Sequence, residues 1–253
     1  MIETDSVLGK VRLILEAFHH GEEHVALAEL ARRTGLPKAT IHRICADLVG
    51  WGALERSGSG YRLGLRLFEL GQRVSRPRAL RDAAYPCMEE LAFTTKETVH
   101  CAIRDGHEVL YVEKIGGYRL VSRPSRTGGR LPLHCTATGK VLLAFAGREV
   151  IDDVLGEPLR RFTNHTITSP RRLRSELEQI RSTRVAVESE ECRIGYLSVA
   201  APVFDGRQQL VGAISVAAPT MRASVTRLVA GVRTAAEAVS RRVDRMRQES
   251  WIA

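Results

Sequence analysis

The amino-acid sequence predicts an α+β protein of two domains. Up to Val74 most apolar residues recur at the three- and four-residue spacings of amphipathic helices. Beyond residue 95, two pairs of alternating segments surround Asp-Gly turns, which is the pattern of β-hairpins. The stretch Ser75-Arg76-Pro77-Arg78 separates the two patterns, and we expect Pro77 to end the preceding helix. The domain boundary is therefore expected here.

The first domain opens with an amphipathic helix over residues 7–18, which has a broad apolar face. A second, shorter helix follows, because Leu27, Leu30 and Ala31 fall at i, i+3 and i+4. Gly35 supplies the left-handed residue that ends this helix.

A third helix is expected from Pro37, with Ile41, Ile44, Cys45 and Leu48 facing inward. The opposite face is small and basic, and consists of Lys38, Ala39, His42, Arg43 and Ala46.

Two short strands follow, at residues 53–56 and 61–63, joined by Ser57-Gly58-Ser59-Gly60. The sequence thus predicts a winged helix-turn-helix domain over residues 1–64, with the helix-turn-helix at about 27–47 and the wing at about 53–63. A linker helix is expected at 65–77.

Two short helices whose outer residues are small and basic can enter the DNA major groove. A basic hairpin beside them can contact the phosphate backbone. The candidate DNA-binding residues are Arg32, Lys38, Thr40, His42, Arg43, Arg56 and Arg62. A protein-docking winged helix without a DNA target is the alternative.

The second domain, residues 78–253, is expected to be an antiparallel sheet with helices on its faces. Its expected helices lie at 78–95, 136–145, about 170–183 and 225–246, and its expected strands at 98–104, 109–115, 118–123, 195–204 and 210–217. Pro86 falls inside the first of these helices, and Ser169 precedes the third as its cap.

Composition is that of a globular protein, with 44% hydrophobic and 26% charged residues in 253. No apolar run is long enough to span a membrane, and the acidic N-terminus is unlike a signal peptide, so we expect a cytoplasmic protein without a membrane partner. The five cysteines are scattered, which fits reduced thiols. The net charge of +9 is spread over the chain, since residues 1–76 hold 11 Lys and Arg against 9 Asp and Glu.

No enzyme is expected, because the sequence has no nucleophile elbow, phosphate-binding loop or zinc-protease motif. No cofactor and no metal are expected either: His100-Cys101 and His134-Cys135 are adjacent pairs, and neighbours on a strand point to opposite faces. The alternative is an enzyme that uses Cys135 as nucleophile at a helix N-terminus.

Four stretches resemble the IclR family of bacterial transcriptional regulators. ELARRTGLPKATIHRI and YRLGLRLFELG are similar to its N-terminal domain. LPLHCTATGKVLLAF and RIGYLSVAAPVFDGRQQLVGAISVAAP are similar to its C-terminal effector domain. The resemblance covers nearly the whole chain in order.

The resemblance implies a C-terminal domain that is GAF-like and binds a small metabolite. It also implies a homodimer or dimer of dimers on a palindromic operator in double-stranded DNA near catabolic genes. Matched motif to motif, the implied effector-binding residues are Leu120, Arg123, Ala137, Thr138, Glu188, Ser198, Ser215 and Ala217.

The chain departs from the family at Ala217, where some members have a second serine that holds the carboxylate of a small acid. This departure argues against a two- or three-carbon keto acid. We therefore expect an aromatic or otherwise bulky carboxylate as the effector, with Arg123 as its ionic partner and Glu188 accepting a hydroxyl proton. We also expect the protein to be a repressor that the ligand releases from DNA. Ser198 and Ser215 could instead be ordinary strand residues, and Arg123 a solvated loop charge.

Overall fold

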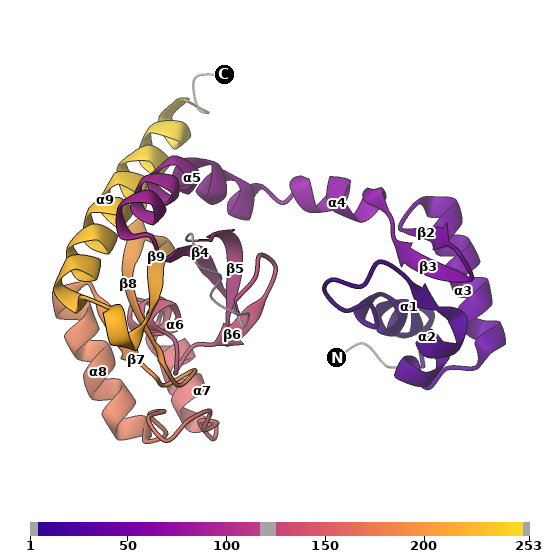
Figure 1. Cartoon of the computed structure of the whole chain (residues 1–253), viewed down its shortest axis with the longest axis horizontal. Helices are drawn as coiled ribbons and strands as arrows, with labels where there is room; N and C mark the ends of the chain where they lie inside the picture. Colours follow the sequence, from indigo (N-terminus) through magenta and orange to yellow (C-terminus); the bar gives the residue numbers. More distant parts are fainter. Residues whose placement is uncertain (1–4, 117–124, 250–253) are drawn as a thin grey trace. The chain divides into compact units, whose positions relative to one another are not determined.

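The computed structural model describes residues 5–116 and 125–249 (Figure 1). They form two compact units, Met1–Ser75 and Arg76–Ala253. Within the described ranges, no helix is both long and apolar enough to cross a membrane.

The first unit is a winged helix-turn-helix. Its elements are α1 (Val7–Glu16), β1 (Val25–Ala26), α2 (Leu27–Thr34), α3 (Lys38–Trp51), β2 (Leu54–Ser57), β3 (Gly60–Leu63) and α4 (Leu65–Gln72). Gly35 ends α2 with φ of 71°, as expected from the sequence, and its N–H donates to the Ala31 carbonyl at 2.9 Å. The inward residues of α3 are buried with Ile14, Leu30 and Tyr61.

The wing has one more strand than the sequence predicts. β1 pairs with β3, so the sheet order is β1-β3-β2. Gly60 permits this contact, because a Cβ there would lie 2.3 Å from the carbonyl oxygen of Val25. A two-residue strand is too short to show an alternating pattern, which is why the sequence does not reveal it.

The second unit is a six-stranded antiparallel sheet with helices on both faces, ordered β6-β5-β4-β9-β8-β7 (Figure 1). Its strands are β4 (Thr98–Asp105), β5 (Glu108–Ile115), β6 (Arg130–Pro132), β7 (Ala186–Ser189), β8 (Tyr196–Phe204) and β9 (Leu210–Pro219). Its helices are α5 (Ser75–Thr95), α6 (Ala137–Ala144), α7 (Arg148–Gly156), α8 (Pro170–Thr183), the 3-10 turn η1 (Thr220–Arg222) and α9 (Val225–Glu249). The predicted α+β class is confirmed.

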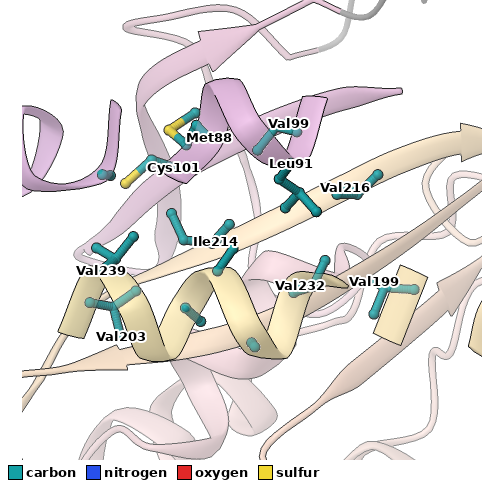
Figure 2. Close-up of a cluster of buried hydrophobic side chains, with 14 of the residues drawn as sticks. Met88, Leu91, Val99, Cys101, Val199, Val203, Ile214, Val216, Val232 and Val239 are labelled. Carbon is teal, nitrogen blue, oxygen red and sulfur yellow. The ribbon is translucent and has the colours of Figure 1, made fainter. Parts of the chain in front are cut away.

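One face of the sheet packs on α5 and α9. Met88 and Leu91 of α5 meet Val232 and Val239 of α9 over the strands, as Figure 2 shows. The strand residues on this face are Val99, Cys101, Val199, Val203, Ile214 and Val216. They alternate along each strand, so their neighbours in sequence must point to the other face.

The other face packs on α6, and α7 and α8 pack in turn on α6. Ala102, Ala186, Ala200 and Ala213 line it, and Leu142 and Leu143 of α6 are among the helix residues that cover it. Small strand residues let α6 approach the sheet closely. Two residues away from these alanines, on the same face of the sheet, lie His100, Glu188, Ser198 and Ser215, which line the hollow described below.

The structure differs from the sequence reading at Pro77. We expected Pro77 to end the linker helix and the next helix to begin at Arg78, but α5 already begins at Ser75. Pro77 lies in the first turn, where its missing N–H costs nothing because such groups have no partner within the helix. Pro86 lies inside α5 and Ser169 caps α8, both as expected. The strand expected at 118–123 lies outside the described residues, and β6, β7 and α7 were not anticipated.

Candidate DNA-binding surface and effector pocket

The outward face of α3 is the first candidate site. Lys38, His42 and Arg43 are exposed on it, whereas Thr40 is half-buried. Ile41, Ile44 and Cys45 anchor the opposite side of the helix in the core of the unit. The helix therefore presents basic side chains from its first two turns on a fixed backbone, the geometry with which a recognition helix enters a major groove.

Two adjacent arginines of α2 have different roles. Arg32 is exposed and donates to Glu29 at 2.6 and 2.8 Å, beside the turn that leads into α3. Arg33 faces inward, where it donates to the Ala17 carbonyl at 2.7 Å and pairs with Glu22 and Glu29. Arg33 thus joins α1 to α2, and only Arg32 belongs to the candidate surface.

The wing arginines project from opposite faces of the hairpin. Arg56 lies opposite Tyr61 in the register and its guanidinium is 5.6 Å from that ring. Arg62 lies opposite Glu55 and pairs with its carboxylate at 2.6 Å, and its hydrogen bond to Glu55 holds the pKa of that carboxyl below its usual range. The sequence alone does not distinguish the two arginines. In the structure they differ, because Arg62 is paired with the carboxylate of Glu55.

The second candidate site is a hollow of about 60 Å³ on the α6 face of the sheet. Five of the eight residues implied by the family resemblance line it: Thr138, Glu188, Ser198, Ser215 and Ala217. Ala137 lies next to Thr138 but is buried in the core. Leu120 and Arg123 lie outside the described residues.

Strand register brings these residues together. Glu188 of β7 lies opposite Ser198 of β8, and Ser198 lies opposite Ala217 of β9. Ser215 is two residues from Ala217, so both side chains emerge on the same face. Thr138 approaches from α6, and its hydroxyl donates to that of Ser215 at 2.8 Å.

Glu188 already has three hydrogen-bond partners within the chain. Its side chain accepts the Ser198 hydroxyl at 2.6 Å and the N–H groups of Glu191 at 2.6 Å and Cys192 at 3.2 Å. Burial raises the pKa of its carboxyl against these hydrogen bonds. Because a carboxylate offers about four acceptor sites, Glu188 is largely committed to the chain's own donors and has little capacity left for a ligand hydroxyl.

Several lining residues were missed from the sequence: His100, Tyr111, Ser125, Leu131, Thr136, Cys192, Arg193 and Tyr196. His100 lies opposite Ser215, its Nε2 is 2.6 Å from the Ser125 hydroxyl, and burial lowers the pKa of His100 to about 3. The imidazole is therefore neutral at physiological pH. Alternation along β4 places residue 100 on one face, but only the pairing of β4 with β9 reveals that this face carries Ser215.

The segment Glu190–Gly195, between β7 and β8, forms part of the wall of the hollow. Lys140 of α6 is fully buried; its ammonium binds Glu176 at 2.7 Å and also binds Glu191. The hydroxyls of Thr163 and Thr166 donate to the carbonyls of Glu190 and Glu191, each at 2.6 Å. A buried ion pair and two hydrogen bonds thus fix this segment against α6 and the loop before α8.

Cys135 does not have the properties of a nucleophile. It is buried just before α6, and a hydrogen bond with Cys192 together with burial raises the pKa of its thiol. A thiol held in its protonated form is a poor nucleophile.

Comparison with known proteins gives a consistent result. Residues 7–58 match the family model for the IclR helix-turn-helix domain, and residues 72–241 match that for the bacterial transcriptional regulator IclR C-terminal domain. The HTH-type transcriptional regulator KdgR of Escherichia coli is 36% identical over 94% of this chain and 93% of its own. The transcriptional repressor IclR of the same organism is 30% identical over 83% and 78%. An IclR homolog of Microbacterium hydrocarbonoxydans, solved as a complex with 4-hydroxybenzoate, has a TM-score of 0.88 and 32% identity over 94% and 99% of the two chains.

The buried ammonium of Lys140 should be important for stability. We expect Lys140→Met to lower the free energy of unfolding by about 3 kcal/mol in urea, because Glu191 is left buried without its cation. Adding Glu191→Gln should recover part of the loss. The control is Arg148→Met, which breaks an exposed ion pair with Asp152 and should cost less than about 1 kcal/mol. A Lys140→Met protein as stable as the wild type would contradict this role.

Proposed function

The chain belongs to the IclR family of bacterial transcriptional regulators, and on that premise we propose that it represses catabolic genes until a small aromatic carboxylic acid releases it from its operator. It is a DNA-binding regulator with an effector-binding C-terminal domain, and not an enzyme. We also propose that the protein is cytoplasmic, because a regulator that binds operator DNA must be in the compartment that contains the bacterial chromosome.

The polar hollow on the α6 face is the observation that carries the proposal. Thr138, Ser198 and Ser215 contribute hydroxyl groups to its lining. Leu131, Tyr111 and Ala217 contribute apolar and aromatic surface. A structural neighbour of the chain holds 4-hydroxybenzoate, a planar aromatic acid. The name of the IclR repressor of Escherichia coli supports repression as the mode of action. Ala217 in place of a second serine supports an aromatic acid over a short keto acid.

For DNA binding, we propose that α3 reads base edges through Lys38, Thr40, His42 and Arg43, while Arg32, Arg56 and Arg62 contact phosphates.

Arg43→Ala should weaken binding to the operator by about 1–3 kcal/mol if Arg43 reads a guanine edge. Fluorescence anisotropy with the selected operator measures this. Arg245→Ala, which removes the same charge from exposed α9, is the control and should leave affinity unchanged. An Arg43→Ala protein with wild-type affinity would place the recognition surface elsewhere.

For assembly, we propose a homodimer, or a dimer of dimers, built through the DNA-binding half and matched to a palindromic operator. The support is exposed apolar surface at Leu8 of α1 (69%) and at Leu65 (72%) and Phe68 (65%) of α4.

Leu8→Glu combined with Phe68→Glu should shift the protein toward monomer in sedimentation at micromolar concentration. Phe93→Glu is a matched control, because Phe93 is also 65% exposed but lies on α5 of the other unit. A wild type that sediments as a monomer would refute the proposal.

The effector experiment tests the proposed function most directly. Aromatic carboxylic acids, with 4-hydroxybenzoate as the first probe, should raise the melting temperature and weaken operator binding by about 5- to 150-fold, the usual range of allosteric coupling. Pyruvate and glyoxylate should do neither. Ser215→Ala and Thr138→Val should each weaken the response, since both remove a polar contact from the hollow. If no acid in the screen binds, the carboxylate is removed from the proposal.

A further inference from the structure

We infer that Arg193 binds the carboxylate of the effector, and that its stacking on Tyr196 fixes where that carboxylate lies. The inference rests on the proposed function, because it assumes an acidic effector. It assigns the ionic contact to a residue that lies in a stretch similar to the family but is not among the eight effector-binding residues that the resemblance implies.

The charges around the hollow favour Arg193. Of the lining residues in the described parts of the chain, it is the only lysine or arginine, and Glu188 is the only carboxyl group. His100 adds no positive charge, because burial keeps its imidazole neutral at physiological pH. An acid that enters beside Glu188 needs a fixed cation nearby, and among these residues Arg193 provides it.

The backbone on both sides of Arg193 is fixed. On one side, the N–H groups of Glu191 and Cys192 donate to Glu188. On the other, the N–H of Gly195 donates to the Glu190 carboxylate at 2.9 Å, and the Glu190 N–H donates to the Tyr196 carbonyl at 2.8 Å. With the backbone on both sides held in place, ligand binding requires no ordering of the loop that carries Arg193.

The side chain of Arg193 is oriented as well. Its guanidinium lies 4.6 Å from the centroid of the Tyr196 ring, and both residues line the hollow. Stacking uses the face of the guanidinium, whereas carboxylate binding uses the N–H groups along its edge. The two interactions are therefore compatible, and the stacking on Tyr196 keeps the guanidinium beside the hollow.

This assignment predicts a change in selectivity. Arg193→Gln leaves Glu188 as the charged lining residue, so an anionic ligand loses an attractive partner while a neutral ligand of the same shape loses little. The ratio of acid to amide affinity should therefore fall, which a general loosening of the pocket would not cause.

The test is calorimetric titration of the full-length protein with 4-hydroxybenzoate and 4-hydroxybenzamide. In Arg193→Gln the acid should bind about 10- to 100-fold more weakly, the usual effect of removing a hydrogen bond to a charged group, and the amide should bind nearly as in the wild type. Arg193→Lys should fall between, because it keeps the charge but not the planar fork. Arg184→Gln is the matched control: Arg184 also stacks on an aromatic ring, that of Phe204 at 5.3 Å, but does not line this hollow.

Arg123→Gln is measured in parallel, because Arg123 is the carboxylate partner expected from the family resemblance. Wild-type acid affinity in Arg193→Gln together with loss of acid binding in Arg123→Gln would overturn the assignment. So would an equal loss of acid and amide binding in Arg193→Gln. If wild-type protein binds its operator but no acid, the proposed effector class fails, and the role of Arg193 fails with it.

Discussion

The register of β4, β9, β8 and β7 is the constraint on which the candidate effector pocket depends. A strand shifted by one residue would turn its side chains to the opposite face. Ser198 and Ser215 would then point toward α5 and α9, and Val199 and Val216 toward α6. Both faces of the sheet are buried, so such a shift would place hydroxyls in an apolar core and is strongly disfavoured. The same packing that stabilises the sheet therefore fixes the position of every strand residue in the hollow.

The wall of the hollow depends on a second constraint, the buried ammonium of Lys140. This side chain is the largest fully buried one in the described chain, and it is charged. Burying it is costly unless carboxylates meet it, and Glu176 and Glu191 do so from α8 and from the segment after β7. The ion pair thus acts as a positional constraint: it holds Cys192 and Arg193 at the hollow through their neighbour Glu191.

Much of this arrangement could be predicted from the sequence, and the rest could not for identifiable reasons. Periodicity gives α2, α3 and both long hairpins, and Gly35 and Ser169 mark helix ends through their own chemistry. β1 and β6 are too short to show a period. Five site residues follow from the family motifs and line one hollow, but His100 and Arg193 depend on strand pairing and on a loop whose course is set by Lys140. The partners of Glu188 within the chain, the N–H groups of Glu191 and Cys192, could not be predicted because backbone hydrogen bonds of a loop leave no pattern in a sequence.

A ligand can alter DNA binding only if it favours one conformation of the effector domain over another. The hollow lies on one face of β4, β8 and β9, and the alternate residues of these strands pack on α5 through Val99, Val216 and their neighbours (Figure 2). The interior is close-packed, so a shift of these strands on one face must be accommodated on the other. α5 begins at Ser75, where the chain arrives from the DNA-binding unit, and it is the first element of the effector domain to receive such a shift. The sheet is therefore the packed layer between the hollow on the α6 face and α5, the helix at the start of the second unit.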